Sequence, residues 1–105
     1  MIYELRTYIS PPARLPDIVE RFRSRTMEIF ARHGFDVVGF WTVNDADNEL
    51  VYLLRWDSPE ASSCAWEAFR ADPEWIETRK VTEANGPIVE QIIEKTLFST
   101  DFSPI

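Results

Sequence analysis

Two charged residues near the start of the chain are the best candidates for binding chemistry. Glu4 and Arg6 interrupt a segment that is otherwise rich in apolar and aromatic side chains, and their spacing places them on one face if that segment is a β-strand. The structural interpretation is an ion pair with Glu49, Arg55 or a second copy of the chain. It is favoured because such pairs often serve structure alone. The functional alternative is that Arg6 binds an anionic substrate group through a bidentate contact.

A group of aromatic residues provides the second chemical signal. If the middle of the chain forms a β-hairpin, alternation places Phe40, Tyr52 and Trp56 on one face of the sheet. Trp66, from a helix that follows, can reach over these rings. Core packing is the default role of such residues, but Tyr and Trp also carry polar groups that need partners when buried. Together with Arg6, the four rings are therefore candidates for lining a cleft that takes a small apolar or aromatic ligand.

Other reactive side chains are isolated along the chain. His33 is the only histidine and precedes a glycine, which favours a cation at a helix end over a proton carrier. Cys64, the only cysteine, falls on the apolar stripe of a predicted helix, which favours a small buried side chain over a nucleophile. Asp45, Asp47 and Glu49 resemble the start of a calcium loop but lack the glycine and flanking helices of an EF-hand. No metal and no cofactor is predicted.

Periodicity predicts the elements that position these residues. Residues 2–9 have the composition of a strand, and Pro16 opens a helix whose apolar positions recur at helical spacing until Gly34 stops it. Two further strands are expected over residues 35–43 and 49–56, joined by a five-residue loop of turn-forming residues.

The second half of the chain predicts a broken helix and a last strand. Residues 57–60 combine a capping residue, a proline and an acidic first turn, and residues 72–74 repeat that start signal. The helix is therefore expected to break and restart, and to stop at residues 85–87. A final strand is expected over residues 88–98.

This order of elements predicts the fold class. Strand, helix, two strands, helix and strand correspond to a ferredoxin-like βαββαβ domain of the α+β class, with a four-stranded antiparallel sheet and both helices on one face. A chain of 105 residues has the usual size of one domain, so a single domain over residues 1–105 is expected.

The sheet face without helices is also apolar, which predicts a partner. Symmetric pairing of the hairpin places Trp41 opposite Val51, Gly39 opposite Leu53 and Val37 opposite Arg55 on this face. The strands of a sheet with one solvated face should alternate apolar and polar residues. Here both faces are apolar, so something is expected to cover the face without helices. A second copy of the chain, giving a dimeric α/β barrel, is favoured over two alternatives: a final strand and tail that fold back over the face, or apolar residues that simply remain on the surface. The candidate interface residues are Val37, Trp41, Val51 and Leu53.

Charge and composition exclude several classes of partner. A formal net charge of −7 opposes binding to nucleic acid or to anionic lipid, both of which require clustered cations. No apolar run approaches the roughly 20 residues of a membrane helix, and neither a secretory signal nor a pair of cysteines is present, which predicts a cytoplasmic protein. Within the first helix, Asp17 with Arg21 and Glu28 with Arg32 are expected to form i,i+4 pairs on the exposed side.

Short blocks spread over nearly the whole chain form a recognisable set. They are Tyr3-Glu4-Leu5-Arg6-Thr7-Tyr8, His33-Gly34-Phe35, Val38-Gly39-Phe40-Trp41, Asn48-Glu49-Leu50-Val51, Asp72-Pro73-Glu74-Trp75 and Phe102-Ser103-Pro104-Ile105. In this order the blocks resemble the NIPSNAP family. The resemblance implies a dimeric α/β barrel, the superfamily that also contains small antibiotic-type monooxygenases and haem-degrading enzymes. It implies no established reaction.

The chain also departs from that family where chemistry would be sought. Tyr52 stands where many members carry His, and Leu54 where they carry Trp, and the first strand lacks the Asn of haem-degrading relatives. Two functions follow. The favoured one is a homodimeric small-molecule-binding or assembly domain, because no base is positioned by a second group. The alternative is a cofactor-independent monooxygenase or isomerase of an aromatic or polycyclic substrate, with Tyr52 or Arg6 stabilising an enolate-like anion.

Overall fold

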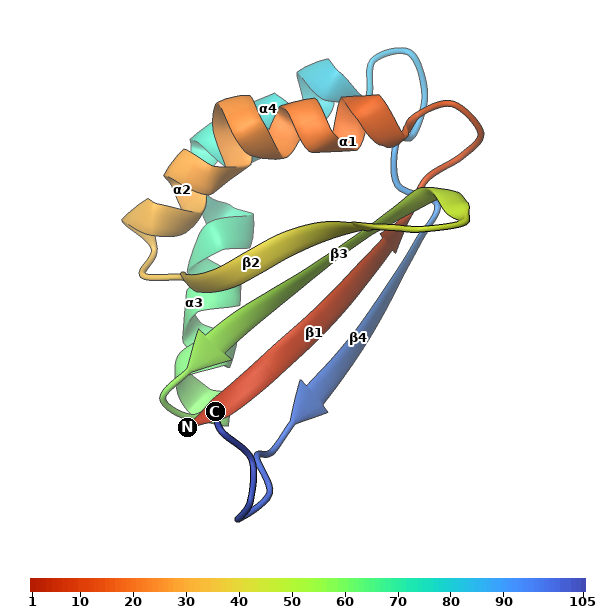
Figure 1. Ribbon diagram of the computed structural model, residues 1–105. Coiled ribbons are helices and arrows are strands. Elements are labelled where there is room, and N and C mark those ends of the chain that lie inside the picture. The colour runs from red at the N-terminus through yellow and green to blue at the C-terminus, as the bar shows by residue number, and fades with distance from the viewer.

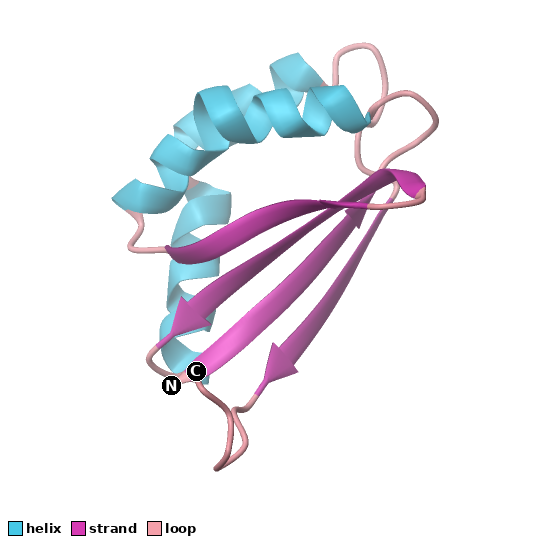
Figure 2. Ribbon diagram, viewed as in Figure 1, coloured by secondary structure: helices cyan, strands magenta, loops and turns pink.

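The computed structural model describes residues 1–105 and confirms the predicted order of elements. The elements are β1 (Ile2–Ile9), α1 (Leu15–Arg21), η1 (Phe22–Thr26), α2 (Met27–Arg32), β2 (Asp36–Val43), β3 (Ala46–Trp56), α3 (Pro59–Ala71), α4 (Pro73–Thr82) and β4 (Gln91–Leu97). The four strands form an antiparallel sheet in the order β2-β3-β1-β4. The helices lie over one face of this sheet (Figure 1), and Figure 2 shows the other face without a helix. The α+β, ferredoxin-like class is therefore confirmed.

The first helical segment is one rod with a wide turn in its middle. Met27 N–H donates to the Phe22 carbonyl, five residues back, and the intervening turn Phe22–Thr26 is a π-helix. The Thr26 hydroxyl donates to the Arg21 carbonyl at 3.3 Å. Wide turns of this kind are rare and are often found at functional sites. The π-helical turn begins directly after Arg21, so this residue lies where the hydrogen-bond pattern of the helix changes.

The i,i+4 pairs expected on the exposed side of this rod are wrong. Asp17 pairs with Arg14 instead, at 2.6 Å. Arg21 is buried and reaches Glu83 at the end of α4, because it lies three residues after buried Ile18 and so shares its face. Arg32 turns to Asp72 at 2.7 Å. Arg21 and Arg32 therefore have tertiary partners in place of the expected local ones, and Asp17 has a different local partner.

The predicted break between α3 and α4 is confirmed, and one residue makes it. Asp72 ends α3 and caps α4, since its carboxylate accepts a hydrogen bond from the Glu74 backbone N–H at 2.8 Å. The same carboxylate accepts from Arg32 and contacts His33 Nε2, both at 2.7 Å. His33, the C-cap residue of α2, thus stands at a helix end as expected. Asp72 fastens the end of α2 to the junction of α3 and α4.

Cys64 corrects one expectation for α3. Trp66 and Phe69 form the buried side of this helix, whereas Cys64 is exposed. The two aromatic side chains, three residues apart, set the face that meets the sheet. Cys64 lies off that face, so its thiol is accessible and not part of the core.

The β2–β3 hairpin keeps part of the expected register and loses part. Trp41 pairs with Val51 and Gly39 with Leu53, as predicted. A bulge after Val37 then shifts the pairing, so that Val37 opposes Leu54 and the expected pair with Arg55 is wrong. Val37 consequently packs against the core under the helices and leaves the opposite face, since a one-residue shift moves a side chain across the sheet. The expected loop over residues 44–48 is also shorter, because β3 begins at Ala46.

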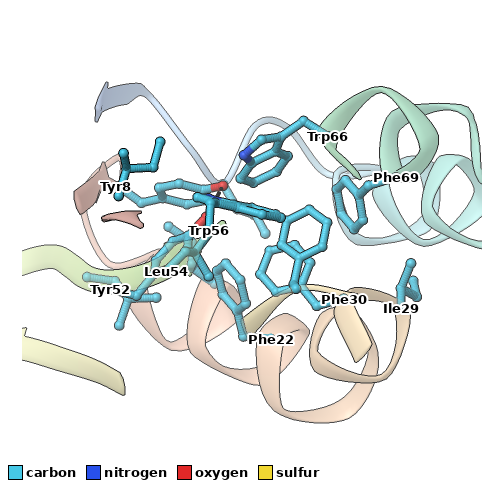
Figure 3. Packing of buried hydrophobic residues seen from close by; sticks show 14 residues of the cluster. Tyr8, Phe22, Ile29, Phe30, Tyr52, Leu54, Trp56, Trp66 and Phe69 are labelled. Carbon is cyan, nitrogen blue, oxygen red and sulfur yellow. Dashed lines mark hydrogen bonds between the residues drawn. The ribbon is translucent and has the colours of Figure 1, made fainter. Parts of the chain in front are cut away.

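The core lies between the sheet and the helices and is largely aromatic (Figure 3). Tyr52 is its centre: its side chain is fully buried and contacts the rings of Phe22, Phe30, Phe40 and Tyr8. Ile88, from the expected last strand, instead belongs to the connection before β4 and is also fully buried. Strand β4 itself is exposed along its length.

The opposite face of the sheet carries an apolar row that crosses all strands. Trp41, Val51, Thr7 and Ile93 are paired in sequence from β2 to β4 and therefore share this face. Trp41 is 51% exposed and Ile93 39% exposed. The Trp41 indole folds back over Gly39, where a Cβ atom would lie 2.9 Å from the ring. Glycine at this position lets the ring lie flat on the sheet.

Candidate functional site

The buried charges of β1 form a network with tryptophans. Arg6 Nη1 donates to Glu4 Oε2 at 2.7 Å, and both side chains are about nine-tenths buried. Glu4 Oε1 accepts from three groups: Trp56 Nε1 at 2.8 Å, Trp66 Nε1 at 3.0 Å and the Ser62 hydroxyl at 3.2 Å. The carboxylate is thus almost saturated with donors. This arrangement matches the structural interpretation of the pair, although the expected partners Glu49 and Arg55 are wrong.

Those two expected partners lie on the other face of the sheet. Arg55 forms an ion pair with Asp36 at 2.8 Å, and Glu49 pairs across the strands with Ile9. Side chains alternate between the two faces of the sheet along β1, so Ile9 points to the other face from Glu4 and Arg6. Spacing along one strand therefore identified the shared face of Glu4 and Arg6, while strand order decided which residues meet them.

Arg6 contacts a second carboxylate and an aromatic ring in addition to Glu4. Its Nη1 also donates to Glu94 Oε2 on β4 at 2.7 Å, and its guanidinium carbon lies 4.2 Å from the centroid of the Trp66 ring. Its Nε is buried without a hydrogen-bond partner. Burial opposes the charge, but the phenols of Tyr52 and Tyr8 and the Glu4 carboxylate outweigh it, so that the pKa of Arg6 lies above its ordinary value.

The predicted aromatic residues divide into two groups. Phe40, Tyr52 and Trp56 belong to the core, where the Phe40 and Tyr52 rings stack at 4.8 Å. The Tyr52 hydroxyl donates to the Tyr8 hydroxyl at 3.0 Å. Burial, and then the neighbouring Tyr8, raises the pKa of the Tyr52 phenol well above its ordinary value, so it is a neutral donor. Trp66 also belongs to the core cluster, but it lines a pocket together with Arg6.

This pocket lies between α3 and α4 on one side and β1 and β4 on the other. Its volume is about 400 Å³. The aromatic part of its lining consists of Tyr8, Trp66, Phe69 and Trp75. The charged part consists of Arg6, Arg21, Arg70 and Arg79 with Glu83 and Glu90. Of the predicted pocket residues, the structure brings Arg6 and Trp66 together here, and Phe40, Tyr52 and Trp56 do not line it.

Arg21 is one of the pocket residues that sequence reasoning missed. Its side chain is only 4% exposed, and its Nη1 donates to Glu83 Oε2 at 3.0 Å and to the Thr82 hydroxyl at 3.2 Å. Its Nε is buried without a partner, and its guanidinium lies 4.9 Å from the Trp75 ring centroid. Burial, partly opposed by Glu83, lowers the pKa of Arg21. The feature of the sequence that could have identified Arg21 is its position three residues after Ile18, which places it on the apolar face of the helix.

The arrangement is suited to binding. It combines aromatic walls with fixed guanidinium groups, which recognise planar or anionic groups. No group of three or more His, Cys, Asp or Glu side chains converges to hold a metal ion, and no helix is both long and apolar enough to cross a membrane.

Comparison with known proteins gives a family and a fold. The family model described as NIPSNAP matches residues 3–104. The crystal structure of Atu4242 from Agrobacterium tumefaciens is 24% identical, with a TM-score of 0.85 over 100% of this chain and 99% of that one. An uncharacterised NIPSNAP domain protein from Burkholderia xenovorans is 20% identical, with a TM-score of 0.84 over 100% of both chains. No curated protein matches significantly.

A more distant similarity connects the fold to an enzyme. SnoaB from Streptomyces nogalater, a cofactor-independent oxygenase, is 18% identical, with a TM-score of 0.67 over 99% of this chain and 97% of that one. At this identity the likeness concerns the fold.

Proposed function

The chain belongs to the NIPSNAP family, and we propose that it is a homodimer that binds a small aromatic or apolar molecule in the pocket beside Arg6. The observation that carries the proposal is the pocket itself, which offers about 400 Å³ between sheet and helices with Tyr8, Trp66 and Trp75 in its walls. Sites of roughly 300–1,000 Å³ that combine aromatic walls with a few polar groups are typical of small-molecule binding.

Arg6 has a positioning role in this proposal. Two carboxylates, Glu4 and Glu94, already share its charge, and Glu4 is itself fixed by two indole N–H groups. Arg6 therefore holds Trp66 in place as one wall of the pocket. Removing its charge would leave Glu4 buried without its cation, which is far more costly than loss of an exposed pair.

The helix-free face supports the homodimer. Trp41, Val51 and Ile93 lie on one row across the sheet, with Leu5 and Leu53 on the adjoining row. The C-terminal tail does not cover this row, since Trp41 is 51% exposed while Phe98 and Phe102 in the tail remain 71% and 84% exposed. Contiguous apolar surface of this kind marks interaction sites, and a second copy of the same sheet supplies a matching apolar surface with the symmetry common in dimers.

The second candidate function is cofactor-independent oxygenation or isomerisation of an aromatic or polycyclic substrate. Its support is the fold shared with SnoaB. Tyr52 is unsuited to the role of stabilising an enolate-like anion, because its side chain is fully buried and its hydroxyl is bonded to Tyr8. Arg6 is opposed by two carboxylates. Binding is therefore preferred, and protein-dependent oxygen uptake with 1-naphthol as probe would reverse that preference.

Calorimetric titration with 2-naphthamide and 2-naphthoate tests the binding proposal. Both probes carry an aromatic body that suits the walls, and at least one is expected to bind. Ile92→Trp places a large ring in the lining at a residue that is 46% exposed, and it should abolish binding. Val81→Trp, on α4 at a residue that is 62% exposed and outside the lining, is the matched control. Binding that survives Ile92→Trp would place the ligand elsewhere.

A further inference from the structure

We propose that Arg21 binds a carboxylate group on the ligand, so that the pocket selects aromatic carboxylates. This inference rests on the proposed function, because it names the ligand class of the same pocket. The hydrogen bonds of Arg21, the charges around it and its place on the helix support this assignment.

The first observation is an unused edge of the guanidinium. Nη1 of Arg21 is occupied by Thr82 and Glu83, whereas Nε is buried without an acceptor and Nη2 forms no hydrogen bond. Nη2 is therefore a free charged donor for a carboxylate oxygen, while Nε is enclosed and has no acceptor. A guanidinium with donors left unpaired is costly, so this side chain is suited to an acceptor that arrives with a ligand.

The second observation is the balance of charge at the two ends of the pocket. At the Arg6 end, one guanidinium faces two carboxylates, those of Glu4 and Glu94. At the other end, Glu83 Oε2 is shared between Arg21 at 3.0 Å and Arg79 at 3.2 Å.

Two more charged residues belong to the lining. Arg70 lies 5.6 Å from the centroid of the Trp66 ring, which Arg6 also contacts, and Glu90 is exposed at the edge. The Arg6 end therefore has two carboxylates of its own, Glu4 and Glu94, whereas Arg21 and Arg79 share a single oxygen of Glu83. A further acceptor is favoured beside Arg21.

The third observation is the wide turn that begins directly after Arg21. The π-helix Phe22–Thr26 interrupts the regular hydrogen bonding of the rod, which costs stability and recurs at functional sites. Arg21 and Phe22 are both buried around this point. The turn lets the rod bury Phe22 in the core while Arg21 faces the end of α4.

The surroundings favour an aromatic carboxylate over an isolated small anion. Trp75 lies beside Arg21, and Phe69 and Trp66 continue the wall toward Arg6. A ligand whose carboxylate sits at Arg21 can therefore place its ring against these side chains. Inorganic phosphate would satisfy the guanidinium but would leave the aromatic wall without a contact.

The test compares 2-naphthoate with its neutral isostere 2-naphthamide by titration calorimetry. A charge-assisted hydrogen bond from Arg21 predicts that the parent protein binds the acid roughly tenfold or more tightly than the amide. Equal affinities would overturn this inference and leave the proposed function standing. Failure of both probes to bind would overturn the proposed function and this inference with it.

Two variants with opposite expected effects on the affinity for 2-naphthoate test whether Arg21 binds the carboxylate. Arg21→Gln should reduce the affinity for 2-naphthoate to that for 2-naphthamide. Glu83→Gln removes the carboxylate that competes for Arg21 and should tighten binding of 2-naphthoate several-fold relative to 2-naphthamide, a gain that a damaged fold does not produce. Arg23→Gln, an exposed residue of the same rod that pairs with Glu20, controls for net charge. A preference for the acid that persists in Arg21→Gln, or no gain in Glu83→Gln, would overturn the assignment.

Discussion

The guanidinium carbon of Arg6 lies 4.2 Å from the centroid of the Trp66 ring, while the indole N–H of the same Trp66 donates to Glu4 Oε1 at 3.0 Å. One tryptophan thus contacts both members of a buried ion pair. Trp66 links the sheet to α3 and also forms a wall of the pocket, so the charged network and the pocket share a single rigid element.

Glu4→Gln is expected to be strongly destabilising. The substitution leaves the Arg6 cation buried without its fixed carboxylate, and loss of one partner of a buried pair costs about 3–5 kcal/mol. Glu94→Gln is the matched control, because its side chain is 64% exposed and exposed pairs contribute at most about 1 kcal/mol. Urea denaturation measures the loss of unfolding free energy in both variants. A loss in Glu4→Gln as small as the loss in Glu94→Gln would show that Glu94 alone is a sufficient partner for Arg6.

Tyr52 is expected to behave as a core residue. Tyr52→Ala should leave a cavity under the helices and cost about 3–5 kcal/mol of unfolding free energy. Tyr52→Phe keeps the ring and removes only the hydrogen bond to Tyr8, so it should cost about 0.5–1.5 kcal/mol. The same unfolding measurement compares them. A small loss in Tyr52→Ala would instead indicate a side chain with free space around it.

Leu53→Glu is expected to separate the proposed dimer. The side chain is half-buried on the helix-free face, and a buried charge opposite a second sheet is not paired. Light scattering at micromolar concentration should give a dimer mass for the parent and a monomer mass for this variant, with unchanged circular dichroism. Ile76→Glu, on α4 at a residue that is 54% exposed, should remain dimeric. A monomeric parent would refute the dimer.

The contribution of Asp72 to stability is expected to be present at neutral pH and to be lost in acid. Hydrogen bonds from Arg32 and then His33 hold the pKa of this carboxyl well below its ordinary value of 3.8. A lowered folded-state pKa contributes stability that is present above the ordinary value and is lost as the pH falls toward the folded-state value. Asp72→Asn should therefore lower the melting temperature at pH 7, and the difference from the parent should shrink below about pH 4. A constant difference from pH 7 to pH 3 would contradict this coupling.

Cys64 is expected to react in the folded state. Its thiol is exposed on α3, so one equivalent of Ellman's reagent should react without denaturant. Absorbance at neutral pH follows the reaction, and Cys64→Ser provides the blank. Reaction that requires urea would show that another surface covers this side of α3.

The sequence determined the local elements and their order. Capping and breaking signals at Ser58, Asp72 and Gly34 depend on neighbours within a few residues, and the structure uses all three. The alternation that put Glu4 and Arg6 on one face is likewise a property of one strand. Such local rules were sufficient for the ferredoxin-like class because each element carries its own period.

Tertiary structure decided which residues meet. The bulge after Val37 moved that side chain to the core, and the sheet order brought Glu94 to Arg6. Arg21, expected on the exposed side, found Glu83 at a separation of 62 residues. These outcomes depend on strand register and on the packing of elements that are distant in the sequence. A buried cation is stable only where a carboxylate from another part of the chain lies beside it.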